Sequence, residues 1–229
     1  MVWVIGALVL SYLVGGFPTA ILAGKLLRGI DVRDYGSHNA GATNVWRVLG
    51  AKPAVGVLLV DAFKGVVAVV FISRIGAAGQ LLDATTLEVL CGLMAIVGHI
   101  WTVFAGFRGG KGVGTAAGVF GALAPWAVLI ALVSFVAVVA LTRYISAGSI
   151  TAGVVLAAAL IVQHALYPET LPHIVMVVGT VVAFLVIVKH RSNIRRLLNG
   201  TENRFGRPAS AAPTASASTE TKAPEAGKS

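Results

Sequence analysis

The residues best suited to bind ligands or to catalyse a reaction lie in three short polar segments. Each segment lies between long apolar runs. The first segment, Gly36–Asn44, reads GSHNAGATN and is followed closely by Arg47. Its glycines allow several backbone N–H groups to converge on one anion, and an arginine can grip a phosphate with a fork of donors. A plain turn followed by a helix N-cap is the simpler interpretation, but the density of small donors favours a phosphate site. The candidate residues are Ser37, Asn39, Thr43, Asn44 and Arg47.

The second segment, Gly106–Thr115, reads GFRGGKGVGT and resembles a P-loop at first sight. It differs from a Walker A motif because Lys111 is followed by glycine instead of Ser or Thr, and because no strand is predicted before it. The segment still leads into a predicted helix, whose free N–H groups and dipole favour phosphate. A flexible basic loop that touches lipid headgroups is the alternative. The candidate residues are Gly109, Gly110, Lys111 and Gly112.

The third segment, Lys189–Leu198, reads KHRSNIRRLL and combines a basic cluster with His190 and Asn193. Residues three apart lie on one face of a helix, so this segment would present both side chains together as it leaves the membrane. Arginines alone would indicate only a basic cluster beside the membrane. A capping or interface role is the alternative for His190 and Asn193, but an imidazole beside an amide favours a polar site.

Carboxylates are scarce around these segments. Asp31 and Asp34 are the only acids near the first segment, and the second has none. Divalent metals usually need several carboxylate ligands, so we expect no metal and no cofactor. No histidine is followed four residues later by aspartate, and no convincing Ser-His-Asp set is present. Asp61 and Lys64 lie within an apolar run, where a structural ion pair is at least as good an interpretation as a functional one.

The elements that must position these segments are membrane helices. Of the 229 residues, 57% are hydrophobic and only 12% are charged, whereas a soluble domain carries about 25% charged residues. The net charge of +9 is better explained by basic loops than by nucleic-acid binding, because the charges lie between apolar runs. The single cysteine, Cys91, excludes an internal disulfide. The first residues, MVWVIG, include no basic residue, so we expect a retained helix and not a cleaved signal peptide.

Apolar runs of about 20 residues predict helices that cross the bilayer. The run from Gly112 to Thr142 is too long for one span, and Ala124-Pro125 divides it. The sequence therefore predicts an all-α integral membrane protein with seven transmembrane helices, at 2–24, 54–75, 86–105, 112–123, 126–142, 149–166 and 171–188.

The distribution of basic residues predicts the orientation of these helices. With seven spans, one side receives the loops 25–53, 106–111 and 143–148 and the segment that begins at Lys189. Of the 18 Lys and Arg residues, 14 lie on that side, and the last of these is Arg207. The exceptions are Lys64, Arg74, Lys222 and Lys228. The positive-inside rule then places the N-terminus outside and the C-terminus in the cytoplasm. We expect residues 1–207 to form the membrane domain and 208–229, rich in Ala, Ser, Thr and Pro, to form a disordered cytoplasmic tail.

Three motifs resemble, in order and spacing, those of the acyl-phosphate:glycerol-3-phosphate acyltransferases (PlsY) of bacterial phospholipid synthesis. They are GSHNAGATNVWR, GHIWTVFAGFRGGKGVGT and HRSNIRRLLNGTE, and the resemblance covers about residues 5–206. It implies a seven-helix enzyme of the bacterial inner membrane, with its active site facing the cytoplasm, that transfers an acyl group from acyl phosphate to the 1-hydroxyl of glycerol 3-phosphate. The products would be lysophosphatidic acid and phosphate. The expected partners are these substrates, membrane lipid and the enzyme that makes acyl phosphate, and we expect a monomer.

The resemblance also implies roles for single residues. Ser37, Arg47, His190 and Asn193 would be catalytic, residues 109–112 would bind glycerol 3-phosphate, Ser146 would lie near the acceptor, and Glu202 would be structural. The general base stays open between His190 and a phosphate oxygen of the substrate. The sequence departs from the usual motifs at His38, Thr102 and Arg108, where glycine, proline and lysine are common.

A transporter or channel for an organophosphate is the main rival, since small donors and basic residues at membrane depth would also suit transport. Such a protein needs a water path to the outer side, and polar residues are scarce in the outer halves of the predicted spans. A lipid-binding scaffold would leave Ser37, Arg47, Lys111 and His190 without a role. An acyltransferase is therefore the better interpretation.

Overall fold

The computed structural model describes residues 1–206, and every regular element among them is a helix. The α-helices are α1 (Val2–Gly16), α2 (Thr19–Arg28), α3 (Ala42–Leu49), α4 (Ala51–Val67), α5 (Ser73–Ala77), α6 (Ala84–Ile100), α7 (Val113–Leu123), α8 (Pro125–Thr142), α9 (Ile145–Leu166), α10 (His173–Lys189) and α11 (Arg191–Leu198). Three shorter helical turns are η1 (Val32–Asp34), η2 (Ala68–Ile72) and η3 (Val103–Ala105). The predicted all-α fold is confirmed, and the predicted tail at 208–229 lies outside the described residues.

Five helical stretches are long and apolar enough to cross a membrane, namely Val2–Arg28, Ala51–Ala77, Ala84–Ala105, Pro125–Thr142 and Ile145–Leu166. A sixth is formed by α10 and α11 together, which are bent by 54° at their junction. The remaining apolar helix, α7, has 11 residues and rises only about 16 Å, roughly half of the hydrocarbon thickness. The predicted count of seven depends on α7, so the count and the orientation stay predictions.

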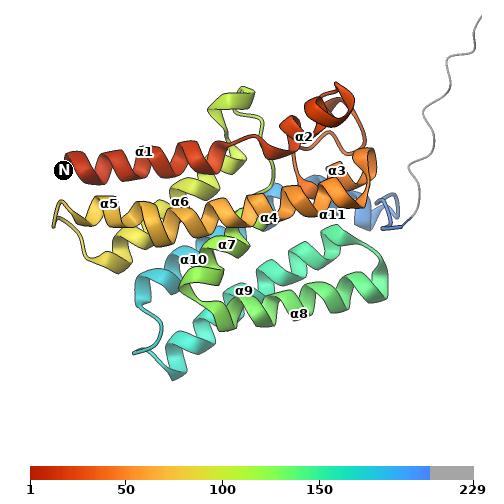
Figure 1. Ribbon diagram of the computed structural model, residues 1–229. Coiled ribbons are helices and arrows are strands. Elements are labelled where there is room, and N and C mark those ends of the chain that lie inside the picture. The colour runs from red at the N-terminus through yellow and green to blue at the C-terminus, as the bar shows by residue number, and fades with distance from the viewer. Residues whose placement is uncertain (207–229) are drawn as a thin grey trace, which may run out of the picture.

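The helices pack as neighbouring pairs along one common direction (Figure 1). The main contacts join α1 to α6, α4 to α7, and α9 to both α8 and α10. Small residues allow two of these pairs to approach closely: a Cβ at Gly98 would lie 2.1 Å from the Tyr12 carbonyl oxygen, and one at Gly118 would lie 1.9 Å from that of Ala62. Close backbone approach through small residues is a common way for helices to associate in membranes.

The first predicted span, 2–24, is interrupted in the structure. Helix α1 ends at Gly16, and α2 begins at Thr19. The cause is Pro18, which lacks an N–H group and clashes with the preceding turn of a helix. The break frees two carbonyl oxygens, and side chains of other helices cover them: Lys64 Nζ donates to Phe17 O at 3.0 Å, and Thr102 Oγ1 donates to Gly16 O at 2.5 Å. The stretch Val2–Arg28 is still long and apolar enough to cross a membrane, but the sequence analysis did not predict the break within it.

The other predicted spans differ from the observed helices by a few residues at their ends. Helix α9 begins at Ile145 instead of 149, so Ser146 lies on the first helical turn and not in a loop. Helix α6 ends at Ile100, and the remainder of the predicted span 86–105 forms a turn that includes η3. These shifts bring the ends of α6 and α9 into the region where the three motifs meet.

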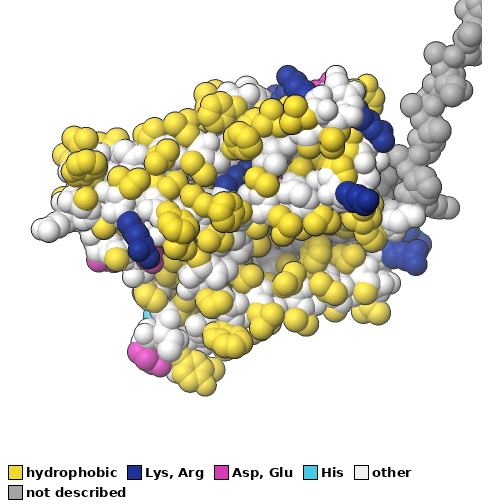
Figure 2. All heavy atoms as spheres, in the orientation of Figure 1, with side chains coloured by type: hydrophobic (Ala, Val, Ile, Leu, Met, Phe, Trp, Pro, Cys, Tyr) yellow, Lys and Arg dark blue, Asp and Glu magenta, His cyan; other side chains and the backbone are white. Residues whose placement is uncertain are grey.

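Apolar side chains cover the flanks of the molecule, and basic side chains gather toward one end (Figure 2). Among the most exposed large hydrophobic residues are Leu59, Phe63, Phe71, Val133 and Phe184. An apolar surface of this extent indicates contact with lipid. The basic end is the one at which α2, α3 and α11 lie in Figure 1, and we call it the motif end because the three motifs meet there.

Candidate functional site

All three motifs contribute to one cavity of about 310 Å³ at the motif end. Its mouth is visible in Figure 2 as a hollow between the surfaces of α4 and α8. Of the residues predicted for the site, those that line the cavity are Ser37, Asn39, Thr43, Arg47, Lys111, Gly112, Ser146, His190 and Asn193. The structure thus brings together side chains that lie more than 150 positions apart in the sequence. Asn44, Gly109 and Gly110 are not among the lining residues.

Asn44 organises the first loop from within. Its side-chain Oδ1 accepts hydrogen bonds from Ser37 N at 2.7 Å and from Ser37 Oγ at 3.1 Å. Its Nδ2 donates to the carbonyl oxygens of Val32 at 2.6 Å and Tyr35 at 3.1 Å. The side chain is buried, and these bonds use its amide fully. Asn44 therefore shapes the loop that carries Ser37. This role differs from the phosphate contact predicted for Asn44.

Arg47 supplies a cation to the cavity from α3. Its guanidinium makes no hydrogen bond to any residue in the range 1–206 that the structure describes, although Arg47 is only partly exposed. Desolvation by burial lowers the pKa of Arg47, and the charge of Glu202 opposes this shift. A half-buried guanidinium with free donors on a cavity wall is well suited to bind an anion.

Gly109 and Gly110 allow the second loop to pack closely against the end of α6. Their N–H groups donate to the carbonyl oxygens of Ile100 and His99, each at 3.1 Å. A Cβ at Gly109 would lie 2.0 Å from the His99 carbonyl oxygen, and one at Gly110 would lie 2.3 Å from His99 Nε2 and 2.8 Å from the Ala40 carbonyl oxygen. These N–H groups are already hydrogen-bonded within the protein, so they are not free to bind phosphate. This differs from the predicted phosphate contact.

Lys111 and Gly112 complete this side of the cavity. Gly112 is the N-cap of α7 and has a left-handed φ of 85°, a conformation that glycine adopts without steric cost. Lys111 Nζ donates a hydrogen bond to Asn193 Oδ1. Desolvation by burial lowers the pKa of Lys111 to about 8, and the charge of Glu202 opposes this shift. The ammonium group is therefore poised to lose its proton under mildly alkaline conditions when the cavity is empty.

His190 and Asn193 lie where α10 gives way to α11. The predicted continuous helix is broken at His190, which is both the C-cap of α10 and the N-cap of α11. Both side chains still line the cavity. His190 Nδ1 lies 2.8 Å from the Val186 carbonyl oxygen, so a neutral ring carries its proton on Nδ1. Nε2 is then the unprotonated nitrogen that can accept a proton or a hydrogen bond.

Glu202 connects several walls of the cavity. Its Oε1 accepts hydrogen bonds from Asn193 Nδ2 at 2.9 Å and Ser146 Oγ at 3.1 Å. Its Oε2 pairs with Arg196 Nε at 2.6 Å. By accepting from Asn193 Nδ2, this carboxylate also orients Asn193 Oδ1, which accepts a hydrogen bond from Lys111 Nζ. The role expected for Glu202 from the resemblance, a structural one, agrees with these contacts.

Sequence reasoning missed several residues that line the cavity. Trp46 of α3 contacts Phe205, with ring centroids 4.7 Å apart, and the two rings border the cavity. Asp61 and His99 also line the cavity. The sequence signal available for Trp46 was its place in the first motif, directly before Arg47. No local pattern could reveal Phe205, because its contact with Trp46 depends on how the chain folds back after α11.

The cavity joins two chemically different halves. Arg47 and Lys111 offer positive charge, and Ser37 and Ser146 offer hydroxyl groups. The other half is lined by apolar side chains of α4 and α8, including Val55, Leu58, Phe135 and Val139. Among residues 1–206, no three His, Cys, Asp or Glu side chains come together in a group that could hold a metal. This arrangement can bind anionic groups next to an apolar chain.

Comparisons with known proteins agree with this chemistry. A family model described as glycerol-3-phosphate acyltransferase matches residues 5–200. The chain is 41% identical to the glycerol-3-phosphate acyltransferase of Chlorobium phaeobacteroides, over 90% of this chain and 99% of that relative. It is 39% identical to the protein of the same name from Chlorobaculum tepidum, again over 90% of this chain and 99% of that relative.

Two crystal structures are also similar. They are two forms of PlsY (YgiH), described as an integral membrane glycerol 3-phosphate acyltransferase, and each is 35% identical to this chain and covers 89% of it. The glycerol 3-phosphate form has a TM-score of 0.73, with 96% of that chain covered. The lysophosphatidic acid form has a TM-score of 0.74, with 95% covered.

Proposed function

The chain belongs to the glycerol-3-phosphate acyltransferase family, and from this premise we propose that it transfers a fatty acyl group from acyl phosphate to the 1-hydroxyl of sn-glycerol 3-phosphate. The products are 1-acylglycerol 3-phosphate and inorganic phosphate, and the reaction begins phospholipid synthesis. The observation that carries the proposal is one cavity whose lining includes both the cations Arg47 and Lys111 and apolar side chains of α4 and α8. Two phosphates and one acyl chain are the groups that such a cavity must accommodate.

The polar half of the cavity suits two phosphate groups. Lys111, which follows the glycine-rich loop, is proposed to hold the phosphate of glycerol 3-phosphate, with Ser146 nearby. Arg47 and Ser37 are proposed to hold the phosphate of the donor. Charge-assisted hydrogen bonds of this kind contribute about 1.5–3 kcal/mol each. Two separate cations keep the two anions close enough for reaction while neutralising their repulsion.

The apolar half suits the acyl chain. Val55 and Leu58 of α4 and Phe135 and Val139 of α8 all line the cavity. The hollow between these helices in Figure 2 opens onto the flank of the molecule that carries exposed hydrophobic residues. We therefore propose that the acyl chain lies between α4 and α8 and reaches the site laterally from the lipid.

The proposed chemistry is a direct acyl transfer. The glycerol oxygen attacks the acyl carbonyl carbon and forms the new ester bond, and the bond from that carbon to the phosphate oxygen breaks. Phosphate leaves with the bonding electrons, so no covalent enzyme intermediate is needed. The hydroxyl proton goes to His190 Nε2 or to a phosphate oxygen of the substrate. Alignment of the two reactants in one cavity accounts for about 7–11 kcal/mol of the barrier reduction in well-oriented reactions.

The donor is tested with purified protein and labelled glycerol 3-phosphate. Acyl phosphate should yield labelled lysophosphatidic acid, whereas acyl-CoA and acyl carrier protein should not, and EDTA should leave the activity intact. Lys111→Ala is the matched negative control, since it removes a proposed anion ligand. Efficient turnover of acyl-CoA, or loss of activity in EDTA, would refute the proposed donor chemistry.

The role of His190 is tested by comparing two substitutions. His190→Ala should lower turnover by about 10²–10⁴-fold if His190 is the base. His190→Gln keeps a hydrogen-bonding group but cannot accept the proton at neutral pH. Near-normal turnover in His190→Gln would identify the substrate phosphate as the base, and near-normal turnover in His190→Ala would remove His190 from the site.

The location of the site follows from the distribution of charge. We propose a monomer with seven spans in the bacterial inner membrane, its N-terminus outside and its motif end in the cytoplasm. Reporter domains fused after Arg207 and inserted at Asp83 should read cytoplasmic and external, respectively. The opposite result would overturn the orientation, and with it the cytoplasmic active site.

A further inference from the structure

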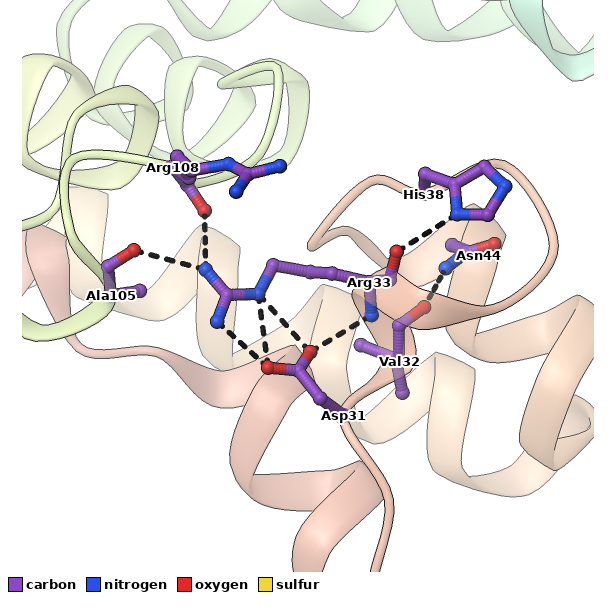
Figure 3. A network of polar contacts seen from close by, with 7 residues as sticks. All are labelled: Asp31, Val32, Arg33, His38, Asn44, Ala105 and Arg108. Atoms are coloured by element: carbon purple, nitrogen blue, oxygen red, sulfur yellow. Dashed lines mark hydrogen bonds and ion pairs between the residues drawn. The ribbon is translucent and has the colours of Figure 1, made fainter.

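Arg33 joins the first loop to the second loop (Figure 3). Its Nη1 donates to the carbonyl oxygen of Ala105 at 2.9 Å and to that of Arg108 at 3.4 Å. The same guanidinium pairs with Asp31, to which Nη2 donates at 2.7 Å and Nε at 3.1 Å. Arg33 does not line the cavity. Any effect of Arg33 on the reaction must therefore pass through the loops that it connects.

The first-loop end of this connection is fixed to the frame that carries Ser37. Asp31 accepts from the backbone N–H of Arg33 at 2.9 Å as well as from its side chain. The neighbouring Val32 carbonyl is held by Asn44, whose Oδ1 also accepts from Ser37 N. His38 Nδ1 lies 3.0 Å from the Arg33 carbonyl oxygen. Arg33 and Ser37 are thus parts of one hydrogen-bonded unit, most of which is visible in Figure 3.

The second-loop end of the connection lies at a strained point. Gly106 and Phe107 have left-handed φ angles of 63° and 60°. Phe107 has no glycine-like freedom, so its backbone conformation is strained. The two carbonyl groups that Arg33 contacts belong to Ala105 and Arg108, which flank this pair directly. Arg33 is therefore placed to stabilise the unusual turn.

Past this turn the chain leads directly to Lys111. Gly109 and Gly110 bond to the end of α6, and the next residue is the proposed ligand of the glycerol 3-phosphate group. The loops also touch at Gly110, where a Cβ would lie 2.8 Å from the Ala40 carbonyl oxygen. A shift of the turn would therefore move Lys111 relative to the first loop.

We propose that Arg33 is a positioning residue that holds the second loop, and through it Lys111, in register with Ser37 and Arg47 of the first loop. The inference rests on the proposed function, because it assigns the two loops to the two substrates. Arg33 does not touch substrate. Its contribution is to keep the two anion sites at the separation that aligns hydroxyl with carbonyl.

The test compares Arg33→Ala with Arg28→Ala. Arg28 is a matched control, because its Nη1 also donates to a backbone carbonyl, that of Val48 at 2.8 Å, but does not bridge to the second loop. A displacement of about 1 Å can cost roughly 100-fold in rate, so Arg33→Ala should lower kcat/KM for glycerol 3-phosphate by about 10- to 100-fold. Arg28→Ala should stay within about threefold of the wild type, because surface substitutions away from the site have small effects. Equal effects of the two substitutions would overturn the proposal.

A double-mutant cycle separates positioning from general destabilisation. If Arg33 acts by placing Lys111, Arg33→Ala should change kcat/KM by less than about threefold in a Lys111→Ala background, because coupled residues are not additive. A full, additive effect in that background would overturn the proposal. Arg33→Lys keeps the charge but not the fork of donors, so its activity should lie between those of the wild type and Arg33→Ala.

The outcomes also separate this proposal from the proposed function. Wild-type protein that fails to acylate glycerol 3-phosphate would refute the proposed function. Active wild-type protein with an unaffected Arg33→Ala variant would refute only the role of Arg33. Thermal unfolding in detergent is measured for every variant. If Arg33→Ala unfolds at a lower temperature, the cycle is repeated with Arg33→Lys, and additivity there would equally overturn the proposal.

Discussion

Asp61 and Glu202 are both buried carboxylates with a basic partner, yet their surroundings differ. Asp61 Oδ1 lies 2.8 Å from Lys64 Nζ on the same helix, and Glu202 Oε2 lies 2.6 Å from Arg196 Nε. Lys64 also donates to the Phe17 carbonyl, and Thr19 Oγ1 donates to Asp61 at 3.2 Å. The Asp61 pair therefore closes the break between α1 and α2.

The Glu202 pair has a different set of neighbours. Asn193 and Ser146, which donate to Glu202, both line the cavity, and Asn193 in turn accepts from Lys111. Asp61 also lines the cavity, but its hydrogen bonds and ion pairs join helices and do not involve proposed substrate ligands. The role of a buried ion pair therefore depends on the additional groups to which its two members are hydrogen-bonded. We therefore expect the Asp61 pair to act mainly on stability and the Glu202 pair mainly on activity.

The largest expected effect is on the Asp61 pair. Lys64→Met removes the cation that lies 2.8 Å from the buried Asp61 carboxylate, and breaking a buried ion pair costs about 3–5 kcal/mol of folding free energy. Thermal unfolding in detergent should show this loss, and the double variant Asp61→Asn/Lys64→Met should recover most of it. Lys52→Met, on the exposed face of the same helix, is the control and should unfold like the wild type. A Lys64→Met protein of normal stability would contradict the proposal that the Asp61 pair acts mainly on stability.

The next effect concerns Glu202. Glu202→Gln removes the charge that pairs with Arg196 and should lower kcat/KM by about 10- to 150-fold, the equivalent of one charge-assisted hydrogen bond of about 1.5–3 kcal/mol. The unfolding temperature should change less than in Lys64→Met, because the segment after α11 can open locally. Glu169→Gln, in an exposed turn, should have no effect on either. A large loss of stability with normal activity would reverse the proposed roles.

The two pairs also show what could be predicted from the sequence. The Asp61–Lys64 pair was predictable, because residues three apart on an apolar helix can only turn toward each other or into the bundle. The contact between Ser146 and Glu202 joins residues 56 positions apart, and no local pattern encodes it. Nine of the residues predicted for the site line the cavity, and all of them except Ser146 lie in the three motifs. The motifs could not reveal that Asn44, Gly109 and Gly110 use their polar groups inside the protein, because bonding partners depend on tertiary packing.

The pH dependence of activity sharpens the link between Glu202 and Lys111. Because burial lowers the pKa of Lys111 to about 8, the ammonium charge of the free enzyme is lost as the pH rises through that value. The kcat/KM for glycerol 3-phosphate, which reports on the free enzyme, should then fall about tenfold for each pH unit above 8. Lys111→Arg should abolish this alkaline fall, because a guanidinium stays charged.

Glu202→Gln gives the corresponding control for the electrostatic link. The charge of Glu202 raises the pKa of Lys111, so its removal should shift the alkaline fall to lower pH. Lys64→Met should leave the midpoint of the fall unchanged. A wild-type profile that stays flat well above pH 8 would contradict the assignment of Lys111 as a charged ligand of the substrate.

The smallest effect comes from two hydroxyl groups in matched positions. Thr19 Oγ1 donates to Asp61 at 3.2 Å, and Ser146 Oγ donates to Glu202 at 3.1 Å. Thr19→Val and Ser146→Ala each remove one such hydrogen bond, worth about 1 kcal/mol. If the two carboxylates have different roles, Thr19→Val should lower the unfolding temperature by about 2–4 °C and leave the kinetics unchanged. Ser146→Ala should instead lower kcat/KM by about fivefold with little change in unfolding temperature. Because the two hydrogen bonds are so alike in length and chemistry, the same pattern in both variants would show that the surroundings of the carboxylate do not determine its role.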